Sequence, residues 1–379
     1  MAAAGRSMKV CLVVATSGRT GVESVVLSLA RGLLKAGAEV SVAMLSHGPL
    51  QELLGSCSVD SRVIPVKHKF DLLKISELRE YFRAGRFDIV HAHGARAAFF
   101  TSLASTRLKS ASLIVSIHEL SDGTFRRSSV KRLENAVYKL SYKACIAVSK
   151  AVADDAVKGR GLSAARIFVI PNCLPDAFSE RAADFSKAHP ISGEESHQHG
   201  LVVGVAGRLD AVKGHKNLIQ AWPKVLDAVP SARLDIAGAG PLEKDLVDLS
   251  AQLGIRQAVN FLGSVEDMVE FYRSINMLVV PSLSESFGIT ILEAMSCGIP
   301  VIASDVGGIR EIVRNEWNGL LVPRESHVAI SDAILRLWSD DSLRSKIISN
   351  GFKSIEPYKQ EAFILSHMEA YKSINPSTR

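Results

Sequence analysis

The chain has 379 residues, of which 47% are hydrophobic and 22% charged, and its formal net charge is +6. This length favours two domains, each with its own core. The longest apolar stretches fall far short of the roughly 20 residues that a membrane-spanning helix needs, which argues against an integral membrane protein. Five scattered cysteines and the lack of a secretory signal at Met1–Ser7 predict a cytoplasmic protein with reduced thiols.

The basic residues are concentrated in the first half of the chain. Residues 1–175 contain 25 lysines and arginines against 13 acidic residues, a net of +12. Residues 176–379 contain 20 against 26, a net of −6. A division this sharp near the middle of the chain indicates two domains with different partners.

The first half repeats one pattern, in which a short apolar run is followed by a turn and a segment of helical period. Lys9–Ala15 is predicted to be a buried strand, Glu23–Ala36 a helix that ends at Gly37, and Glu39–Leu45 the next strand. Five further strands are predicted at Val63–Val66, Ile89–Ala92, Leu113–Ile117, Ala144–Val148 and Ile167–Ile170. Strands that alternate with helices predict a parallel sheet covered on both faces.

The pattern lapses over residues 176–200, which are rich in polar residues and are predicted to be a linker. It then resumes with strands at Leu201–Ala206, Ala232–Ala237, Val259–Leu262, Met277–Val280, Pro300–Ala303 and Gly319–Val322. The prediction is an α/β protein with an N-terminal domain at residues 8–175 and a C-terminal domain at 201–357. Two Rossmann-like domains facing across a cleft would offer a ligand site at the carboxyl ends of their strands.

Residues 281–300 form the most informative segment of the sequence. A strand is predicted to end before a polar loop that holds Glu285, and the helix after the loop holds Glu293. The start of this helix would present unsatisfied backbone N–H groups to an anion. The groups concerned belong to Phe287, Gly288 and Ile289. The alternative is a solvated Glu285 and a capping or surface Glu293.

Two cations follow another predicted strand. Arg208 comes directly after Gly207, and Lys213 follows five positions later. Two cations at the end of a strand, in an otherwise acidic domain, suit a diphosphate, although each alone could be a surface charge. The loop after the next strand contains Gly238 and Gly240 and has room for a nucleotide base or ribose.

Together these motifs resemble the retaining family-4 glycosyltransferases of the GT-B fold. The matching blocks are Gly-Arg-Leu-x3-Lys-Gly, Ala-Gly-x-Gly-Pro, Glu-x7-Glu and the Asp-Val-Gly-Gly-Ile-Arg-Glu of residues 305–311. In the first half, residues 18–23, 88–93 and 117–118 agree more loosely. The resemblance covers roughly residues 8–325. It implies transfer of a sugar from a nucleotide-diphosphate donor, with retention at the anomeric carbon and without a cofactor.

The resemblance implies four catalytic residues, namely Glu285, His118, Arg208 and Lys213. The two cations would hold the donor diphosphate, the glutamate would lie beside the transferred sugar, and the histidine would touch the sugar or its phosphate. Glu293 would accept hydrogen bonds from the ribose, whereas His91 and His93 are expected to be structural. Further donor contacts are expected from Gly18, Gly21, Gly207, Gly238, Gly240, Phe287, Gly288 and Ile289.

Three other functions are less well supported by these residues. An oxidoreductase that uses a dinucleotide is disfavoured because no G-x-G-x-x-G follows the first strand of either domain. A sugar-nucleotide epimerase of the same fold is the closer alternative, although the Glu-x7-Glu block argues against it. A non-catalytic binding protein would not need this cluster of residues. No metal site is predicted, because no Asp-x-Asp occurs in the chain to hold a cation against the diphosphate.

The predicted acceptor domain has a basic and apolar segment from Arg126 to Lys143. Lysines and arginines there alternate with Val130, Leu133, Val137 and Leu140, a pattern typical of an interfacial helix. We therefore expect the enzyme at the inner face of the cell membrane, acting on a lipid-linked or lipopolysaccharide acceptor. The alternative is a solvated helix with its apolar side in the core. Nucleic acid is not expected as a partner, since no aromatic residues interleave with the charges.

The end of the chain carries one more helical segment, at about residues 358–375. Within it, Phe363, Ile364, Met368 and Tyr371 fall on one face of the predicted helix. The resemblance implies that this helix crosses back and packs on the N-terminal domain.

Overall fold

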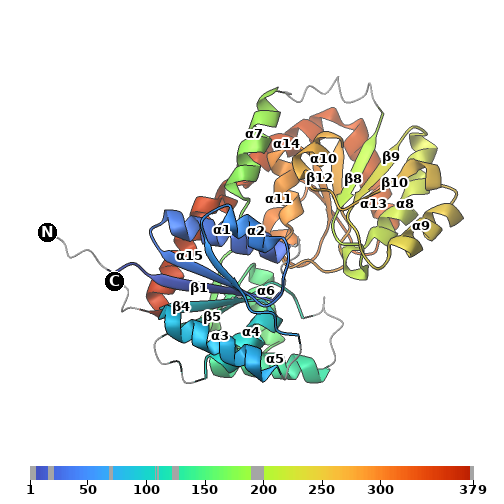
Figure 1. Ribbon diagram of the computed structural model, residues 1–379. Coiled ribbons are helices and arrows are strands. Elements are labelled where there is room, and N and C mark those ends of the chain that lie inside the picture. The colour runs from blue at the N-terminus through green and yellow to red at the C-terminus, as the bar shows by residue number, and fades with distance from the viewer. Residues whose placement is uncertain are drawn as a thin grey trace. The chain divides into compact units, whose positions relative to one another are not determined.

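The computed structural model describes residues 6–15, 21–67, 71–106, 108, 111–121, 128–188 and 200–375. The chain forms two compact units, one made of Met1–Cys173 and Gln360–Arg379 and the other of Leu174–Lys359. Each unit is a Rossmann-like arrangement of a parallel sheet flanked by helices (Figure 1). None of the described helices is long and apolar enough to cross a lipid bilayer.

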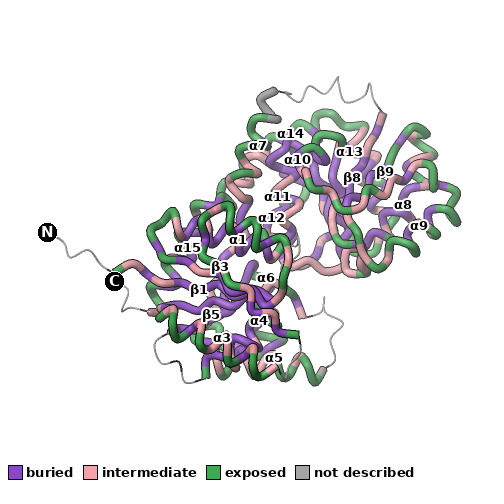
Figure 2. The backbone as a smooth tube through the Cα atoms, in the orientation of Figure 1, coloured by how far each residue is buried: buried purple, intermediate pink, exposed green. Residues whose placement is uncertain are grey.

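The sheet of the first unit has seven parallel strands in the order β3-β2-β1-β4-β5-β6-β7. The strands are β1 Lys9–Val14, β2 Glu39–Met44, β3 Asp60–Val63, β4 Ile89–His93, β5 Ser112–Ile117, β6 Ala144–Ala147 and β7 Ile167–Val169. The inner strands are almost wholly buried (Figure 2) because helices cover both faces of the sheet. This burial explains why these strands could be read from the sequence as continuous apolar runs.

Helices cover the first sheet in two layers (Figure 1). One layer contains α1 (Gly21–Lys35), α2 (Leu50–Gly55) and α15 (Gln360–Ile374), and the other contains α3 (Leu72–Gly85), α4 (Ala95–Ala104) and α5 (Ser128–Ser141). The short α6 (Lys150–Lys158) connects β6 to β7. The last helix, α15, packs closely on α1, since a Cβ placed on Gly32 would lie 2.3 Å from the side chain of Ile364.

The second unit has six parallel strands in the order β10-β9-β8-β11-β12-β13. They are β8 Val202–Ala206, β9 Arg233–Ala237, β10 Val259–Gly263, β11 Met277–Val280, β12 Val301–Ser304 and β13 Leu320–Val322. The helices α8 (His215–Ala228), α9 (Glu243–Gln252) and α13 (His327–Ser339) pack together. A second group contains α7 (Asp176–Ala188), α10 (Met268–Arg273), α11 (Ile289–Ser296) and α14 (Asp341–Ser354), while the short α12 is Ile309–Ile312.

The structure corrects two of the sequence predictions. Strand β3 is Asp60–Val63 and not Val63–Val66, because this edge strand is partly exposed and carries polar residues. The first part of the predicted linker is the helix α7, which packs on α10 and α11. Although α7 is rich in polar residues, one of its faces packs against the rest of the unit. On that face Ala182 is fully buried, and the Phe178 ring lies 6.2 Å from that of Tyr272. Residues 189–199 of the predicted linker lie outside the described residues.

Candidate active site

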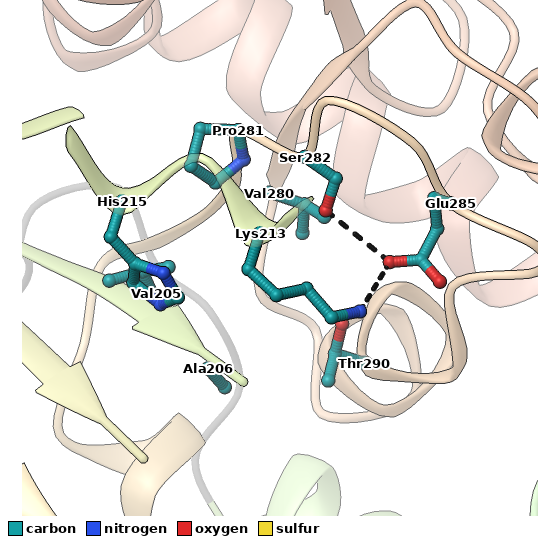
Figure 3. A pocket seen from close by; sticks show the side chains of 9 residues that line it. All are labelled: Val205, Ala206, Lys213, His215, Val280, Pro281, Ser282, Glu285 and Thr290. Atoms are coloured by element: carbon teal, nitrogen blue, oxygen red, sulfur yellow. Dashed lines mark hydrogen bonds and ion pairs between the residues drawn. The ribbon is translucent and has the colours of Figure 1, made fainter. Parts of the chain in front are cut away.

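A small pocket lies where β8 and β11 end in the second unit (Figure 3). The two strands are neighbours in the sheet, with Met277 opposite Val203, so the loops that follow them meet at one edge. Open parallel sheets bind their ligands at this edge. The pocket is lined by Val205, Ala206, Lys213, His215, Val280, Pro281, Ser282, Glu285 and Thr290.

An ion pair between Lys213 and Glu285 is the main polar feature of this pocket (Figure 3). Lys213 ends a short 3-10 turn, where its backbone N–H donates to the Asp210 side chain at 3.3 Å. Its Nζ donates to Oε2 of Glu285 at 2.7 Å, and Ser282 Oγ donates to the same oxygen at 3.3 Å. The lysine side chain is 33% exposed and the glutamate 13%, so both groups are held in place but the cation can still meet a ligand.

Gly214 allows the loops that carry the ion pair to meet. It adopts φ +68°, and a Cβ at this position would lie only 2.0 Å from the carbonyl oxygen of Pro281. The loops are joined further by a hydrogen bond from the N–H of Leu283 to the carbonyl of Val212, at 2.7 Å. A side chain at Gly214 would therefore separate Lys213 from its partner.

The predicted glycines after β8 and β9 lie against one another. A Cβ on Gly238, whose φ is +147°, would lie 1.9 Å from the carbonyl oxygen of Gly207. A Cβ on Gly240 would lie 2.5 Å from the carbonyl oxygen of Leu209. The structure thus gives these glycines a packing role, which holds the loop of Arg208 against the next loop. Their contacts with a donor remain a prediction.

The Glu285 loop leads into α11, which begins after Gly288 at φ +104°. The N–H of Ile291 donates to the carbonyl of Gly288 at 3.0 Å, and the N–H groups before it have no partner within the helix, as at any helix start. Phe287 is buried, with its ring 5.7 Å from that of Tyr358. The backbone N–H of Gly308 donates to the carbonyl of Glu285 at 2.9 Å. This bond joins the motif at residues 305–311 to the loop.

Glu293 lies on α11, one turn beyond its start. Its Oε2 accepts a hydrogen bond of 2.9 Å from the hydroxyl of Tyr272, a fully buried side chain on α10. Burial raises the pKa of the Glu293 carboxyl, and the tyrosine hydrogen bond opposes this shift. The tyrosine holds one carboxylate oxygen, which orients the group that is predicted to meet a ribose.

Arg208 is the one predicted cation that does not line the pocket. Its Nη2 lies 2.6 Å from Oδ2 of Asp210, and its side chain is 73% exposed. No sequence motif pointed to Asp210, although it lies only two positions from Arg208. This carboxylate both orients Arg208 and caps the turn that ends at Lys213.

His215 lines the pocket, although no sequence motif pointed to it. It opens α8 and is only 2% exposed. Neither of its ring nitrogens has a hydrogen-bond partner among the described residues. Burial, and then the charge of Lys213, lower its pKa to about 4, so the ring is neutral near pH 7. Its position directly after the Lys-Gly pair was the available signal.

The predicted residues of the first unit lie on separate elements. His118 follows β5, and its Nε2 lies 3.3 Å from Nδ1 of His93 on β4. Burial lowers the pKa of His118 to about 4, with a further contribution from His367. Gly21 is the first residue of α1, and Gly18 lies outside the described residues.

Nowhere in the described ranges do three or more His, Cys, Asp or Glu side chains gather as a metal site would require.

Two family models match the chain, one in each half. The model of Glycosyltransferase Family 4 matches residues 19–178, and that of Glycosyl transferases group 1 matches residues 191–354. An uncharacterized glycosyltransferase of Methanocaldococcus jannaschii is 30% identical over 369 residues, which cover 91% of this chain and 92% of that protein. A phosphatidyl-myo-inositol mannosyltransferase of Mycobacterium leprae is 27% identical over 94% of each chain.

The fold also matches solved structures. The crystal structure of Anabaena HepE in complex with UDP-glucose superimposes with a TM-score of 0.84 at 20% identity, covering 97% of this chain and 100% of that one. The matching families and both sequence relatives are glycosyltransferases, so the epimerase alternative has no support. With the two parallel sheets and matches in both halves, the chain belongs to the family-4 glycosyltransferases of the GT-B fold.

Proposed function

We propose that the protein is a retaining, metal-independent hexosyltransferase that takes its sugar from a nucleotide-diphosphate donor. The observation that carries this proposal is the ion pair of Lys213 and Glu285 beside the start of α11. A cation, a carboxylate and helix-terminal N–H groups meet there within one small pocket. These are the groups that a sugar diphosphate requires.

The proposed site stabilises the leaving group as its bond to the sugar breaks. Negative charge then grows on the diphosphate, where the ammonium of Lys213 and the N–H groups at the start of α11 would oppose it. Glu285 holds the ammonium in place before the donor arrives, so little reorganisation is needed. Arg208 is exposed and would supply a second cation by moving away from Asp210.

Retention is what the family resemblance implies, and the way Glu285 is held bears on its route. Its carboxylate oxygen accepts hydrogen bonds from both Lys213 and Ser282, which makes the group a weak nucleophile. We therefore propose that the acceptor attacks from the face that the phosphate leaves, with the departing phosphate taking the proton of the acceptor. The cations that meet the diphosphate are side chains, so the reaction needs no divalent metal.

We propose an acceptor at an anionic membrane surface, such as a lipid-linked saccharide or lipopolysaccharide. On α5 the side chains of Val130, Leu133 and Leu140 are 43%, 47% and 86% exposed. These apolar side chains are therefore not packed in a core, and the exposed cations Arg132 and Lys139 lie on the same helix. An exposed apolar stripe beside cations is the pattern of a helix that lies on a lipid surface. The mannosyltransferase relative from Mycobacterium leprae is named for a phospholipid acceptor.

The function can be tested by donor screening followed by product analysis. Thermal shift with UDP, GDP and ADP should identify the base, since a ligand that binds the folded state raises the melting temperature. The matching sugar nucleotides, labelled in the sugar, should then yield a product whose anomeric configuration by NMR equals that of the donor. An inverted product would contradict retention. A labelled free sugar that never joins an acceptor would contradict the transferase proposal.

A further inference from the structure

Among the described residues of the first unit, four histidines are buried or half-buried and are here called the histidine cluster, namely His91, His93, His118 and His367. His91 is fully partnered, with Nδ1 2.7 Å from the hydroxyl of Tyr371 and Nε2 2.8 Å from Ser116 Oγ. Nδ1 of His367 lies 2.9 Å from the carbonyl of Phe363 and must carry its proton, because a carbonyl only accepts.

His93 and His118 share one hydrogen bond within this cluster. Nδ1 of His93 lies 3.3 Å from Nε2 of His118, and the two ring planes differ by 24°. His93 is 3% exposed, and its Nε2 has no partner among the described residues. His118 is half-buried.

Both rings are neutral near pH 7. Burial holds the pKa of His93 well below its usual range, and burial lowers that of His118 to about 4. A neutral imidazole has one N–H donor and one bare acceptor nitrogen. In the shared hydrogen bond, one ring must therefore donate and the other accept.

The orphan nitrogen of His93 decides between the two arrangements. If His118 donated, His93 would carry its proton on Nε2, leaving a buried N–H group with no acceptor. If His93 donates from Nδ1, its Nε2 is a bare lone pair. In folded proteins a backbone N–H is orphaned less often than a carbonyl is left under-satisfied, and we extend this preference to the ring nitrogens.

We propose that His93 is a positioning residue that donates to Nε2 of His118 and thereby fixes the proton of His118 on Nδ1. His118 then carries an uncharged N–H donor on Nδ1, the ring nitrogen that does not face His93. Such a donor suits a phosphate oxygen or a sugar hydroxyl oxygen, and it needs no protonation of the ring. The consequence for turnover rests on the proposed function and on the contact with the sugar or its phosphate that the family resemblance implies for His118.

The tautomer can be measured without any substrate. In protein labelled with ¹⁵N at histidine, long-range NMR correlations distinguish a ring protonated at Nδ1 from one protonated at Nε2. The signals of His118 are those that disappear in His118→Gln. We expect the Nδ1-protonated pattern in the wild type at pH 7.5. An Nε2-protonated His118 would overturn the inference, whether or not the protein transfers sugar.

Two variants of equal size test the effect on turnover. In His93→Asn, the amide N–H can still donate to His118, so kcat should stay within about threefold of wild type. In His93→Asp, the carboxylate can only accept, so it should draw the proton to Nε2. We expect kcat to fall about tenfold to a hundredfold, the range known for partners that orient metal-ligating histidines. The exposed His327→Asn is the matched control.

The outcomes separate this inference from the proposed function. A wild-type protein that transfers no sugar contradicts the function, and the NMR measurement still decides the tautomer. An active wild type with equal kcat in the Asp and Asn variants would overturn the role of His93. If the Asp variant does not fold, as judged by its melting transition, the NMR result on the wild type decides alone.

Discussion

Lys213 and Glu285 are 72 residues apart in the chain, yet the lysine Nζ donates a 2.7 Å hydrogen bond to the glutamate Oε2. The pairing of β8 with β11 explains this contact, because the ends of neighbouring parallel strands meet at one edge of the sheet. Ion pairs at such depth contribute little net stability, since desolvation offsets their attraction. The pair is therefore better understood as part of a binding site than as a support of the fold.

The first prediction concerns the cations that would meet the diphosphate. Lys213→Met and Arg208→Ala should each lower kcat/KM by about a hundredfold or more, on the order of 3 kcal/mol of lost transition-state stabilisation. Lys216→Met is the matched control, because Lys216 is an exposed lysine on the first turn of α8. If both variants fold and keep rates close to wild type, the assignment of these cations is wrong.

Much of the fold could be predicted from the sequence because strands buried on both faces form continuous apolar runs. The edge strand β3 was misplaced because alternate residues of Asp60–Val63 are exposed. The helix α7 was missed because the contacts of Phe178 and Ala182 are made with elements distant in the chain. Tertiary contacts of this kind override a polar local composition.

The candidate site was predictable in its residues but not in their partners. Lys213 and Glu285 could be chosen from their motifs, and the adjacency of their strands follows from the topology. The orientation of Arg208 toward Asp210 depends on side-chain geometry that no spacing reveals. The sequence predicts only a structural role for His93, because its hydrogen bond to His118 depends on β4 and β5 lying side by side.

The second prediction concerns metals. Transfer activity should survive an excess of EDTA, because the proposed countercharges of the diphosphate are Lys213, Arg208 and helix-terminal N–H groups. The measurement is the initial rate with and without chelator, after dialysis against EDTA. Loss of activity with rescue by magnesium or manganese would show that a metal supplies the charge that we assign to side chains.

The third prediction concerns acid stability. Burial lowers the pKa of His118 and His367 to about 4, and holds those of His91 and His93 well below their usual range. Below about pH 6.5 these histidines are protonated in the unfolded chain but stay neutral in the folded chain. The free energy of unfolding is therefore highest above that pH. It decreases as the pH falls toward 4, by up to about 1.4 kcal/mol per pH unit for each histidine.

Thermal melting between pH 7.5 and pH 4.5 tests this effect. The melting temperature should fall steeply below about pH 6.5. His367→Gln should make the decline shallower, because one buried titrating group is removed, whereas the exposed His327→Gln should leave the slope unchanged. A melting temperature that is flat down to pH 5 would contradict the burial of neutral histidines.

The fourth prediction concerns α15. Ile364 is 7% exposed and lies on Gly32 of α1, whereas its neighbour Leu365 is 57% exposed. Ile364→Ala should therefore lower the free energy of unfolding by about 2 to 5 kcal/mol, the usual range for a large aliphatic residue removed from a core. Leu365→Ala should change it by less than about 0.5 kcal/mol. Urea unfolding measures both, and equal effects would count against the packing of α15 on α1.

The fifth prediction concerns the membrane, and it depends on the exposed stripe of α5. Each basic residue near an anionic surface is worth about 1 kcal/mol, so Lys131, Arg132 and Lys139 together with the stripe would hold the enzyme reversibly. The protein should co-sediment with vesicles that contain phosphatidylserine and less so with vesicles of phosphatidylcholine alone. Raising the salt concentration should weaken the first interaction, because salt screens charges at the surface.

Variants separate the apolar and the charged contributions to this binding. Leu140→Glu removes the most exposed apolar side chain of α5, and Arg132→Glu with Lys139→Glu reverses two exposed charges. Both changes should reduce co-sedimentation, because each removes one of the two attractions that an interfacial helix uses. Lys158→Glu on α6 is the matched control, since this lysine is also exposed but lies on another helix.

Arg126 and Arg127, which the sequence also assigns to this surface, lie outside the described residues and serve as a second charge-reversal pair. Equal sedimentation with both kinds of vesicle, or no effect of any α5 variant, would remove the membrane from the proposal while the family assignment stands.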